Sequence, residues 1–289
     1  MPTPSRVEAP RRRSTGEPLP DRHLLYTAAV QHVALDLEHL EEIYGGGRRR
    51  RPTLLREDFC GTAALACGWA ASAPDRHACA VDLHGPTLAW ARRRRLPALG
   101  EAAARVTLFQ ADARVVTRPR VDVVTALNFS YWVFKTRRAL CAYFTAARRS
   151  LNPGGMLLLD AFGGNDAAQA LVEASRVAAS RGPAGERIPP FTFEWEQVSF
   201  NPVDHALRCA IHFRLRDGRR IPRAFSYDWR MWTLPELRET LAEAGFDDAA
   251  VYVQDWDDAA GQALASYSRR DRFENQSGWL AYVVGRVAR

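Results

Sequence analysis

The sequence predicts an α/β fold: a doubly wound, seven-stranded, mostly parallel sheet with helices on both faces, plus a small antiparallel β insertion over the active site. Residues 53–84 read as strand, turn, helix and strand, which is one βαβ unit. Other short apolar segments alternate with helical ones along most of the chain. Between residues 191 and 227, apolar and polar residues instead alternate with a period of two, as in antiparallel strands.

The βαβ unit has the features of a nucleoside-binding crevice. Its first strand opens at Leu54 and ends in acidic residues, and a turn at Gly61 leads directly into an alanine-rich helix. Glycine lets the backbone approach a ligand closely, and the helix behind it presents free N–H groups. A second apolar strand ends in Asp82, whose carboxylate can accept hydrogen bonds from both ribose hydroxyls of a nucleoside.

The turn lacks the glycines that bind a dinucleotide. A pyrophosphate needs G-x-G-x-x-G, but here Phe59 and Ala63 flank the single Gly61. The string from Glu57 to Ala63 instead resembles the E/D-x-G-x-G-x-G first motif of the class I, seven-strand, Rossmann-like S-adenosylmethionine (SAM) methyltransferases, in their small-molecule branch. It departs from that motif at Phe59 and Ala63, and it carries a second acid, Asp58.

The resemblance implies that SAM is the cofactor and that the strand ends bind it. Either Glu57 or Asp58 would face the methionine ammonium, and the sequence leaves this choice open. A third strand over residues 105–109 is followed by Asp112, which resembles the acid of the family's third motif and can accept the adenine amino group. The SAM contacts expected on this basis are Glu57, Asp58, Phe59, Gly61, Thr62, Asp82, Leu83, Asp112, Ala113 and Asn128.

The fourth predicted strand, residues 121–127, leads into an aromatic cluster where this family brings methyl group and acceptor together. Asn128 can orient an amine or hydroxyl, and aromatic rings can stack on a planar acceptor or face the sulfonium. Asp160, at the end of the fifth strand over residues 156–162, is expected at the pocket floor. The predicted catalytic residues are Asn128, Tyr131 and Asp160, and this segment also supplies the predicted substrate contacts Tyr131, Trp132 and Lys135.

The insertion is predicted over the middle of the chain. Residues 163–185 are expected to be mostly helical, and three antiparallel strands follow, with Pro222 placing the last one at a sheet edge. Similar segments in glycine and sugar N-methyltransferases cover the acceptor pocket. The closing end of the insertion mixes charges with large aromatics, as a lid over a small substrate does, and supplies the further predicted substrate contacts Tyr227, Trp229 and Arg230.

The flanking segments complete the predicted core. Leu24 to Ile43 recur at helical spacing and predict one N-terminal helix, of the kind that folds over the SAM crevice in this family. A helix opened by Thr233 and strands over residues 250–256 and 279–287, separated by a mobile polar loop, close the chain. The predicted regions are a disordered basic tail (1–20), an N-terminal cap helix (21–47), the SAM-binding core (48–165), the insertion or lid (166–232) and the rest of the core (233–289).

Composition indicates an ordinary globular protein, with 47% hydrophobic and 25% charged residues. No stretch is long and apolar enough for a membrane span or signal peptide, so a cytoplasmic location is expected. The net charge of +7 comes almost wholly from arginine, and its runs fall in predicted tails and linkers, so the sequence disfavours a nucleic-acid partner. The five cysteines form no C-x-x-C pair, which predicts reduced thiols and no metal site.

The leading functional prediction is a SAM-dependent methyltransferase that acts on a nitrogen or oxygen atom of a small molecule by in-line displacement. A first alternative is a methyltransferase for planar amines of the nucleobase or protein glutamine type, because residues 128–131 keep the ends of the N-P-P-Y motif without its prolines. A second alternative is a SAM-binding protein without catalysis, which the altered glycines at Phe59 and Ala63 would fit.

Overall fold

The computed structural model describes residues 18–45, 51–257 and 262–289. Most of the predicted basic tail lies outside these residues, as do the second and third glycines of the run that follows the N-terminal helices. Within the described ranges, no helix is both long enough and apolar enough to cross a membrane.

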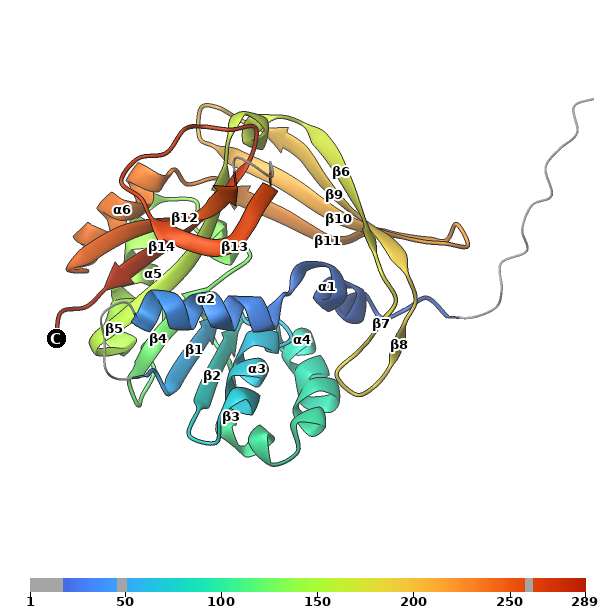
Figure 1. The fold of residues 1–289 in the computed structure, drawn as a ribbon, viewed down its shortest axis with the longest axis horizontal. Coiled ribbons are helices and arrows are strands. Elements are labelled where there is room, and N and C mark those ends of the chain that lie inside the picture. The colour runs from blue at the N-terminus through green and yellow to red at the C-terminus, as the bar shows by residue number, and fades with distance from the viewer. Residues whose placement is uncertain (1–17, 46–50, 258–261) are drawn as a thin grey trace, which may run out of the picture.

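The central sheet has eight strands in the order β13-β12-β14-β5-β4-β1-β2-β3 (Figure 1). The first five strands of the chain run parallel, and the last three are antiparallel. A seven-stranded sheet was predicted; the polar segment expected to be a mobile loop contains β13, which pairs with β12. The strands are β1 (Leu54–Asp58), β2 (His77–Asp82), β3 (Val106–Gln110), β4 (Val121–Ala126), β5 (Leu151–Gly163), β12 (Asp248–Asp257), β13 (Gln262–Arg269) and β14 (Trp279–Arg286).

Helices cover both faces of this sheet, as expected for a doubly wound fold. Helices α2 (Val33–Gly45) and α3 (Ala64–Ser72) pack in one apolar cluster, and α5 (Arg137–Ser150) and α6 (Leu234–Glu243) pack in another. Strand β4 is fully buried. Its consecutive residues Val123 and Val124 point to opposite faces of the sheet, so Val123 packs in the cluster with α2 and α3, and Val124 packs in the cluster with α5 and α6. The segment between β2 and β3 forms α4 (Gly85–Trp90), a π-helical turn (Ala91–Arg95) and the 3-10 segment Leu96–Arg105.

The single N-terminal helix that the apolar spacing predicted is two helices. Helix α1 (Arg22–Val30) ends before Gln31, whose backbone is extended, and α2 starts at Val33. Asp21 caps α1 by accepting a hydrogen bond from the backbone N–H of His23 at 2.8 Å, and it also accepts one from the indole N–H of Trp90 at 2.6 Å. The break lets α1 contact the insertion while α2 lies on the core (Figure 1).

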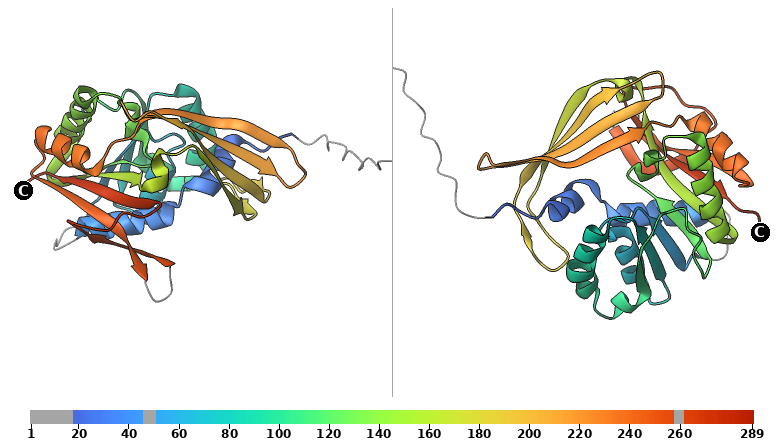
Figure 2. Two further views of the ribbon diagram at one scale, coloured as in Figure 1. Left: turned by 90° about the horizontal axis from the view of Figure 1, so that it is seen from above. Right: turned by 180° about the vertical axis from the view of Figure 1, so that it is seen from behind.

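The insertion is a four-stranded antiparallel sheet in the order β11-β10-β9-β6, set beside the core (Figure 2). Its strands are β6 (Leu171–Val177), β9 (Phe191–Phe200), β10 (Ala206–Leu215) and β11 (Arg220–Arg230), with a short β7–β8 ribbon (Ser180–Arg181 and Arg187–Ile188) between β6 and β9. The prediction of helix for residues 163–185 is wrong. Only Asn165–Ala168 makes a 3-10 turn, and β6 is extended because it pairs with β9, a tertiary contact that outweighs local propensity.

Candidate functional site

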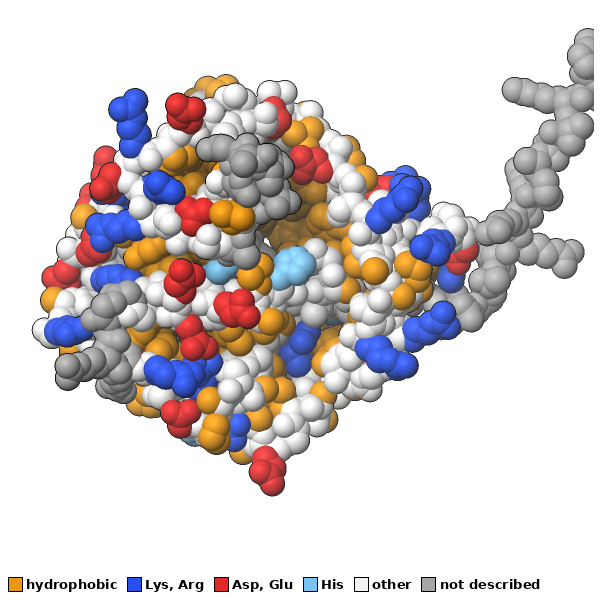
Figure 3. All heavy atoms as spheres, in the orientation of Figure 1, with side chains coloured by type: hydrophobic (Ala, Val, Ile, Leu, Met, Phe, Trp, Pro, Cys, Tyr) orange, Lys and Arg blue, Asp and Glu red, His pale blue; other side chains and the backbone are white. Residues whose placement is uncertain are grey.

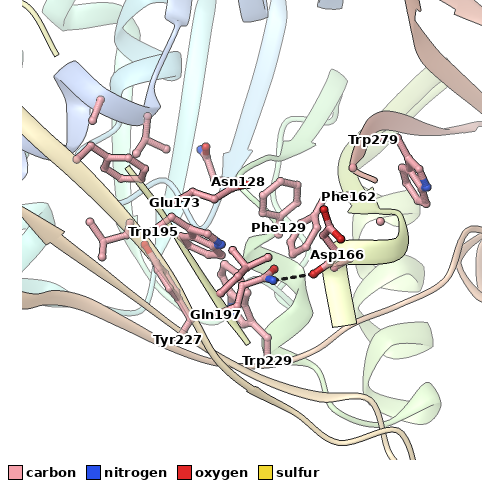
Figure 4. A pocket seen from close by; sticks show the side chains of 18 of the residues that line it. Asn128, Phe129, Phe162, Asp166, Glu173, Trp195, Gln197, Tyr227, Trp229 and Trp279 are labelled. Carbon is pink, nitrogen blue, oxygen red and sulfur yellow. Dashed lines mark hydrogen bonds between the residues drawn. The ribbon is translucent and has the colours of Figure 1, made fainter. Parts of the chain in front are cut away.

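Two cavities adjoin at the carboxyl ends of the parallel strands. The first, here called the strand-end cavity, has a volume of about 540 Å³ and is formed by the ends of β1, β2 and β4 together with α1, α2 and β11. The second, the aromatic cavity, measures about 390 Å³ and lies between the core and the insertion sheet (Figure 4). Both fall within the range of small-molecule sites. Tyr26, Asn128 and Tyr227 line both cavities and therefore mark their junction.

The turn after β1 keeps a glycine-loop backbone although it has only one glycine. Phe59, Gly61 and Ala63 have φ angles of +54°, +52° and +56°, respectively. For the two residues with a Cβ, a left-handed conformation costs about 1 kcal/mol each. Such strain persists where the surrounding structure over-determines it, most often at functional sites. The altered glycines thus leave the loop conformation intact.

Asp82 organises this turn from the end of β2. Its carboxylate accepts hydrogen bonds of 2.7 Å from the backbone N–H groups of Gly61 and His84. Asp82 also lines the strand-end cavity. Because a carboxylate has about four acceptor positions, these two bonds leave capacity for hydroxyl donors from a ligand.

Glu57 and Asp58 both line the same cavity but have different partners. Glu57 accepts a hydrogen bond of 2.8 Å from the N–H of Ala66 in the first turn of α3, and burial raises its pKa to about 8. Burial also raises the pKa of Asp58, to about 6, although the 2.6 Å ion pair with Arg56 and the hydroxyl of Tyr143 partly offset this. Asp58 is therefore bound within the protein, whereas Glu57 is the acid without a cationic partner at hydrogen-bond distance.

Asp160 supports the junction of the two cavities from beneath. Its carboxylate accepts hydrogen bonds from the backbone N–H groups of Asn128 at 2.6 Å and Phe129 at 2.8 Å. Both residues have left-handed backbones, with φ of +56° and +57°. Burial raises the pKa of Asp160 to about 7, and the two N–H bonds oppose that rise. Asp160 lines neither cavity, so it holds Asn128 in place rather than facing a ligand as predicted.

Three of the predicted SAM contacts do not line the strand-end cavity. Leu83 is 69% exposed. Asp112 turns outward to its near neighbour Arg114, whose guanidinium holds the pKa of Asp112 below its usual range. Ala113 is buried, and its carbonyl accepts a 2.6 Å hydrogen bond from Arg56. The predicted contacts that do line the cavity are Glu57, Asp58, Phe59, Gly61, Thr62, Asp82 and Asn128.

Several predicted catalytic and substrate residues also lie away from both cavities. Tyr131 is buried, and its hydroxyl donates to the carbonyl of Asp160 at 2.9 Å. Trp132 is fully buried among other rings. Lys135 forms an ion pair with Asp228, and Arg230 forms one with Glu236. Of the predicted substrate contacts, only Tyr227 and Trp229 line the aromatic cavity.

Other residues of the two cavities carried no signal in the sequence. Asp36 and His84 line the strand-end cavity, and Phe162, Glu173, Trp195, Gln197 and Trp279 line the aromatic cavity. Three of these residues belong to the insertion. Trp195 and Gln197 lie two residues apart in β9, and Glu173 in β6 pairs directly with Trp195, so all three share one face of the sheet. Recognising β6 as a strand would have placed Glu173 on that face.

Comparisons with a protein-family model and with solved structures found similar proteins. Residues 60–157 match a family model described as a methyltransferase domain. No curated protein sequence matches the chain. Among solved structures, SAM-bound CalS10, an amino pentose methyltransferase from Micromonospora echinaspora involved in calicheamicin biosynthesis, is 18% identical, with 91% of this chain and 95% of that one covered and a TM-score of 0.62.

Two other solved structures are similar over nearly their full length. Streptomyces venezuelae DesVI is 19% identical, with 92% of this chain and 96% of that one covered and a TM-score of 0.62. The sugar N-methyltransferase KedS8 from a Streptoalloteichus species is 18% identical, with 99% of this chain and 100% of that one covered and a TM-score of 0.61. At these identities the comparison establishes a shared fold, including the insertion.

Proposed function

We propose that this chain, which carries a class I SAM-dependent methyltransferase domain, transfers a methyl group from SAM to a nitrogen or oxygen atom of a small molecule held in the aromatic cavity. One observation carries this proposal: the strand-end cavity and the aromatic cavity adjoin at Tyr26, Asn128 and Tyr227. In-line displacement needs donor and acceptor on either side of one short passage. The amino pentose and sugar N-methyltransferase relatives support nitrogen as the acceptor atom.

The residues that line the strand-end cavity support SAM as its ligand. Four acidic side chains line it, Asp36, Glu57, Asp58 and Asp82, together with Arg22 and Arg223. A ligand with a sulfonium and an ammonium group suits the acidic part of this wall. The turn from Phe59 to Ala63 brings the backbone against the cavity, and Asp82 has capacity for ribose hydroxyls. Bound there, SAM supplies an electrophilic methyl group on a positively charged sulfur atom.

The protein's part in the reaction is to position and dehydrate the acceptor. Asp160 fixes the backbone of Asn128, whose side chain can orient the attacking atom at the junction. Tyr26 and Tyr227 both line this junction; burial raises the pKa of Tyr26 to about 12 and the pKa of Tyr227 well above its usual value, so both stay protonated. Phe129, Trp195 and the other rings exclude water from the reacting atoms.

The two alternatives are less well supported. In an N-P-P-Y motif, proline follows the asparagine, but Phe129 stands at φ +57°, whereas the proline ring fixes φ near −65°. The loop after β4 therefore has a different shape from that of the planar-amine enzymes. The second alternative, a SAM-binding protein without catalysis, was based on the replacement of two glycines by Phe59 and Ala63. Both residues keep the left-handed backbone that glycine would adopt, so the replacements do not favour this alternative.

The direct test is transfer of label from methyl-labelled SAM. The full chain is incubated with labelled SAM and a small-molecule extract, and products are identified by mass spectrometry against a sample without protein. We expect label in a small molecule, on nitrogen or oxygen. Binding of SAM without any transfer would instead support the non-catalytic alternative, and absence of SAM binding would refute the assignment of the strand-end cavity.

Glu57 provides a test of the cofactor orientation. With a pKa of about 8 it is mostly protonated at pH 7, and an adjacent cation would lower that pKa. Binding of SAM at pH 7 is therefore expected to release roughly one proton. Calorimetry in buffers of different ionisation enthalpy measures this number. The variant Glu57→Gln, which keeps an acceptor for the Ala66 N–H, should release almost none; equal release from both proteins would place the ammonium elsewhere.

A further inference from the structure

The aromatic cavity has a one-sided charge. Two acidic side chains line it, Asp166 and Glu173, and among the described residues that line it there is no arginine, lysine or histidine. Aromatic rings form much of the remaining wall, among them Phe129, Phe162, Trp195, Trp229 and Trp279 (Figure 4). The face drawn in Figure 3 is hollowed between the insertion and helices α1 and α2, and hydrophobic side chains are prominent around that hollow.

Glu173 differs from every other acid of the insertion. Residues 171–230 contain six other carboxylates, and each has a partner within the protein: Glu186 with Arg94, Glu194 with Arg214 and Arg220, Glu196 with His212, Asp204 with the N–H of Ala206, Asp217 with Arg219, and Asp228 with Lys135. In the part of the chain that the structure describes, nothing donates a hydrogen bond or forms an ion pair with Glu173. Glu173 is an exposed side chain that lines the cavity, so its carboxylate is free to pair with a ligand there.

The neighbours of Glu173 suit a cation. Glu173 pairs directly with Trp195 across β6 and β9, so carboxylate and indole lie on the same face of the sheet. Trp195 and Tyr227 each contact Trp229, with centroids 6.1 and 4.3 Å apart. Aromatic faces attract ammonium groups, and a carboxylate beside them adds a charged acceptor. An anionic group would meet two carboxylates and no basic side chain from the described lining.

We propose that Glu173 is a specificity-determining residue. It selects an acceptor whose portion inside the aromatic cavity carries a positive charge and no anionic group. This inference rests on the proposed function, because it assigns the aromatic cavity to the acceptor. It concerns recognition: Glu173 pairs with a cationic group of the acceptor. A phosphorylated or carboxylated acceptor is disfavoured by the same charge.

Three probes that share one ring and differ in charge test this inference. Cyclohexylammonium, cyclohexanol and cyclohexanecarboxylate carry charges of about +1, 0 and −1 at pH 7. Their affinities are measured by ligand-observed NMR titration of the full chain saturated with S-adenosylhomocysteine. The wild-type protein should bind cyclohexylammonium about 10-fold more tightly than cyclohexanol, with cyclohexanecarboxylate weakest, as a hydrogen bond to a charged group implies.

The variant Glu173→Gln should lose the preference for the cation over the alcohol, and Glu173→Asp should keep part of it. The matched control is Glu196→Gln, which removes a carboxylate from β9 that pairs with His212 and does not line the cavity; its preference should match wild type. Equal binding of the cation and the alcohol by wild type, including no binding of either, would overturn the proposal, as would a preference that survives in Glu173→Gln. SAM binding, measured on the same protein preparations before S-adenosylhomocysteine is added, reports separately on the proposed function.

Discussion

Replacing Arg56 with methionine is expected to lower the free energy of unfolding by about 3–5 kcal/mol. Arg56 is fully buried in β1. Its guanidinium pairs with Asp58 at 2.6 Å and donates to the carbonyls of Ala113 at 2.6 Å and Val115 at 2.8 Å, and to the hydroxyls of Thr117 and Ser150. The substitution leaves a buried carboxylate and several acceptors without a donor, which is costlier than the loss of an exposed pair.

Urea unfolding followed by circular dichroism measures this effect. Arg214→Met is the control, because Arg214 is half-exposed and pairs with Glu194 at the surface; its cost should stay under about 1 kcal/mol. The double variant Arg56→Met/Asp58→Asn should recover part of the loss, since it removes the unpaired charge. A cost for Arg56→Met as small as that of the control would show that the network contributes little to stability.

Asp82→Ala is expected to weaken SAM binding by about 100-fold or more. Two hydroxyl hydrogen bonds to an ionised carboxylate contribute about 1.5–3 kcal/mol each, and 1.4 kcal/mol is a factor of ten. The substitution also removes the acceptor for the N–H groups of Gly61 and His84, which hold the turn. Calorimetry with SAM gives the affinity, and circular dichroism confirms that the variant is folded.

Asp112→Ala is the informative comparison for that experiment. The family's third motif predicts that Asp112 binds adenine, but in the structure its carboxylate pairs with Arg114 and does not line the strand-end cavity. SAM affinity should therefore change by less than about threefold, as expected for an exposed ion pair. A loss as large as that of Asp82→Ala would restore the predicted adenine contact. Near wild-type affinity in both variants would argue against a SAM site in this cavity.

The parallel core was predictable because its signals are local. Leu54, Asp82 and the run from Val121 to Ala126 sit in short apolar strands bounded by turns, and parallel strand ends necessarily open at one edge of the sheet. The Thr233 cap of α6 is likewise local, and it forms a capping box with Glu236. Pro222 correctly placed β11 at a sheet edge, because proline has no backbone N–H to donate to a neighbouring strand.

By itself, the sequence determined the βαβ turn, the acid at the end of β2 and the match of residues 60–157 to a methyltransferase domain. Only the tertiary structure decided which side chains face the two cavities. Tyr131 and Asp160 have the right chemistry, but the Tyr131 hydroxyl donates to the Asp160 carbonyl and the Asp160 carboxylate accepts from the backbone N–H of Asn128. Glu173, in contrast, lines the aromatic cavity because β6 pairs with β9. The physical reason is that propensity and turn chemistry act between near neighbours, while the direction of a side chain depends on strand pairing between residues far apart in the chain.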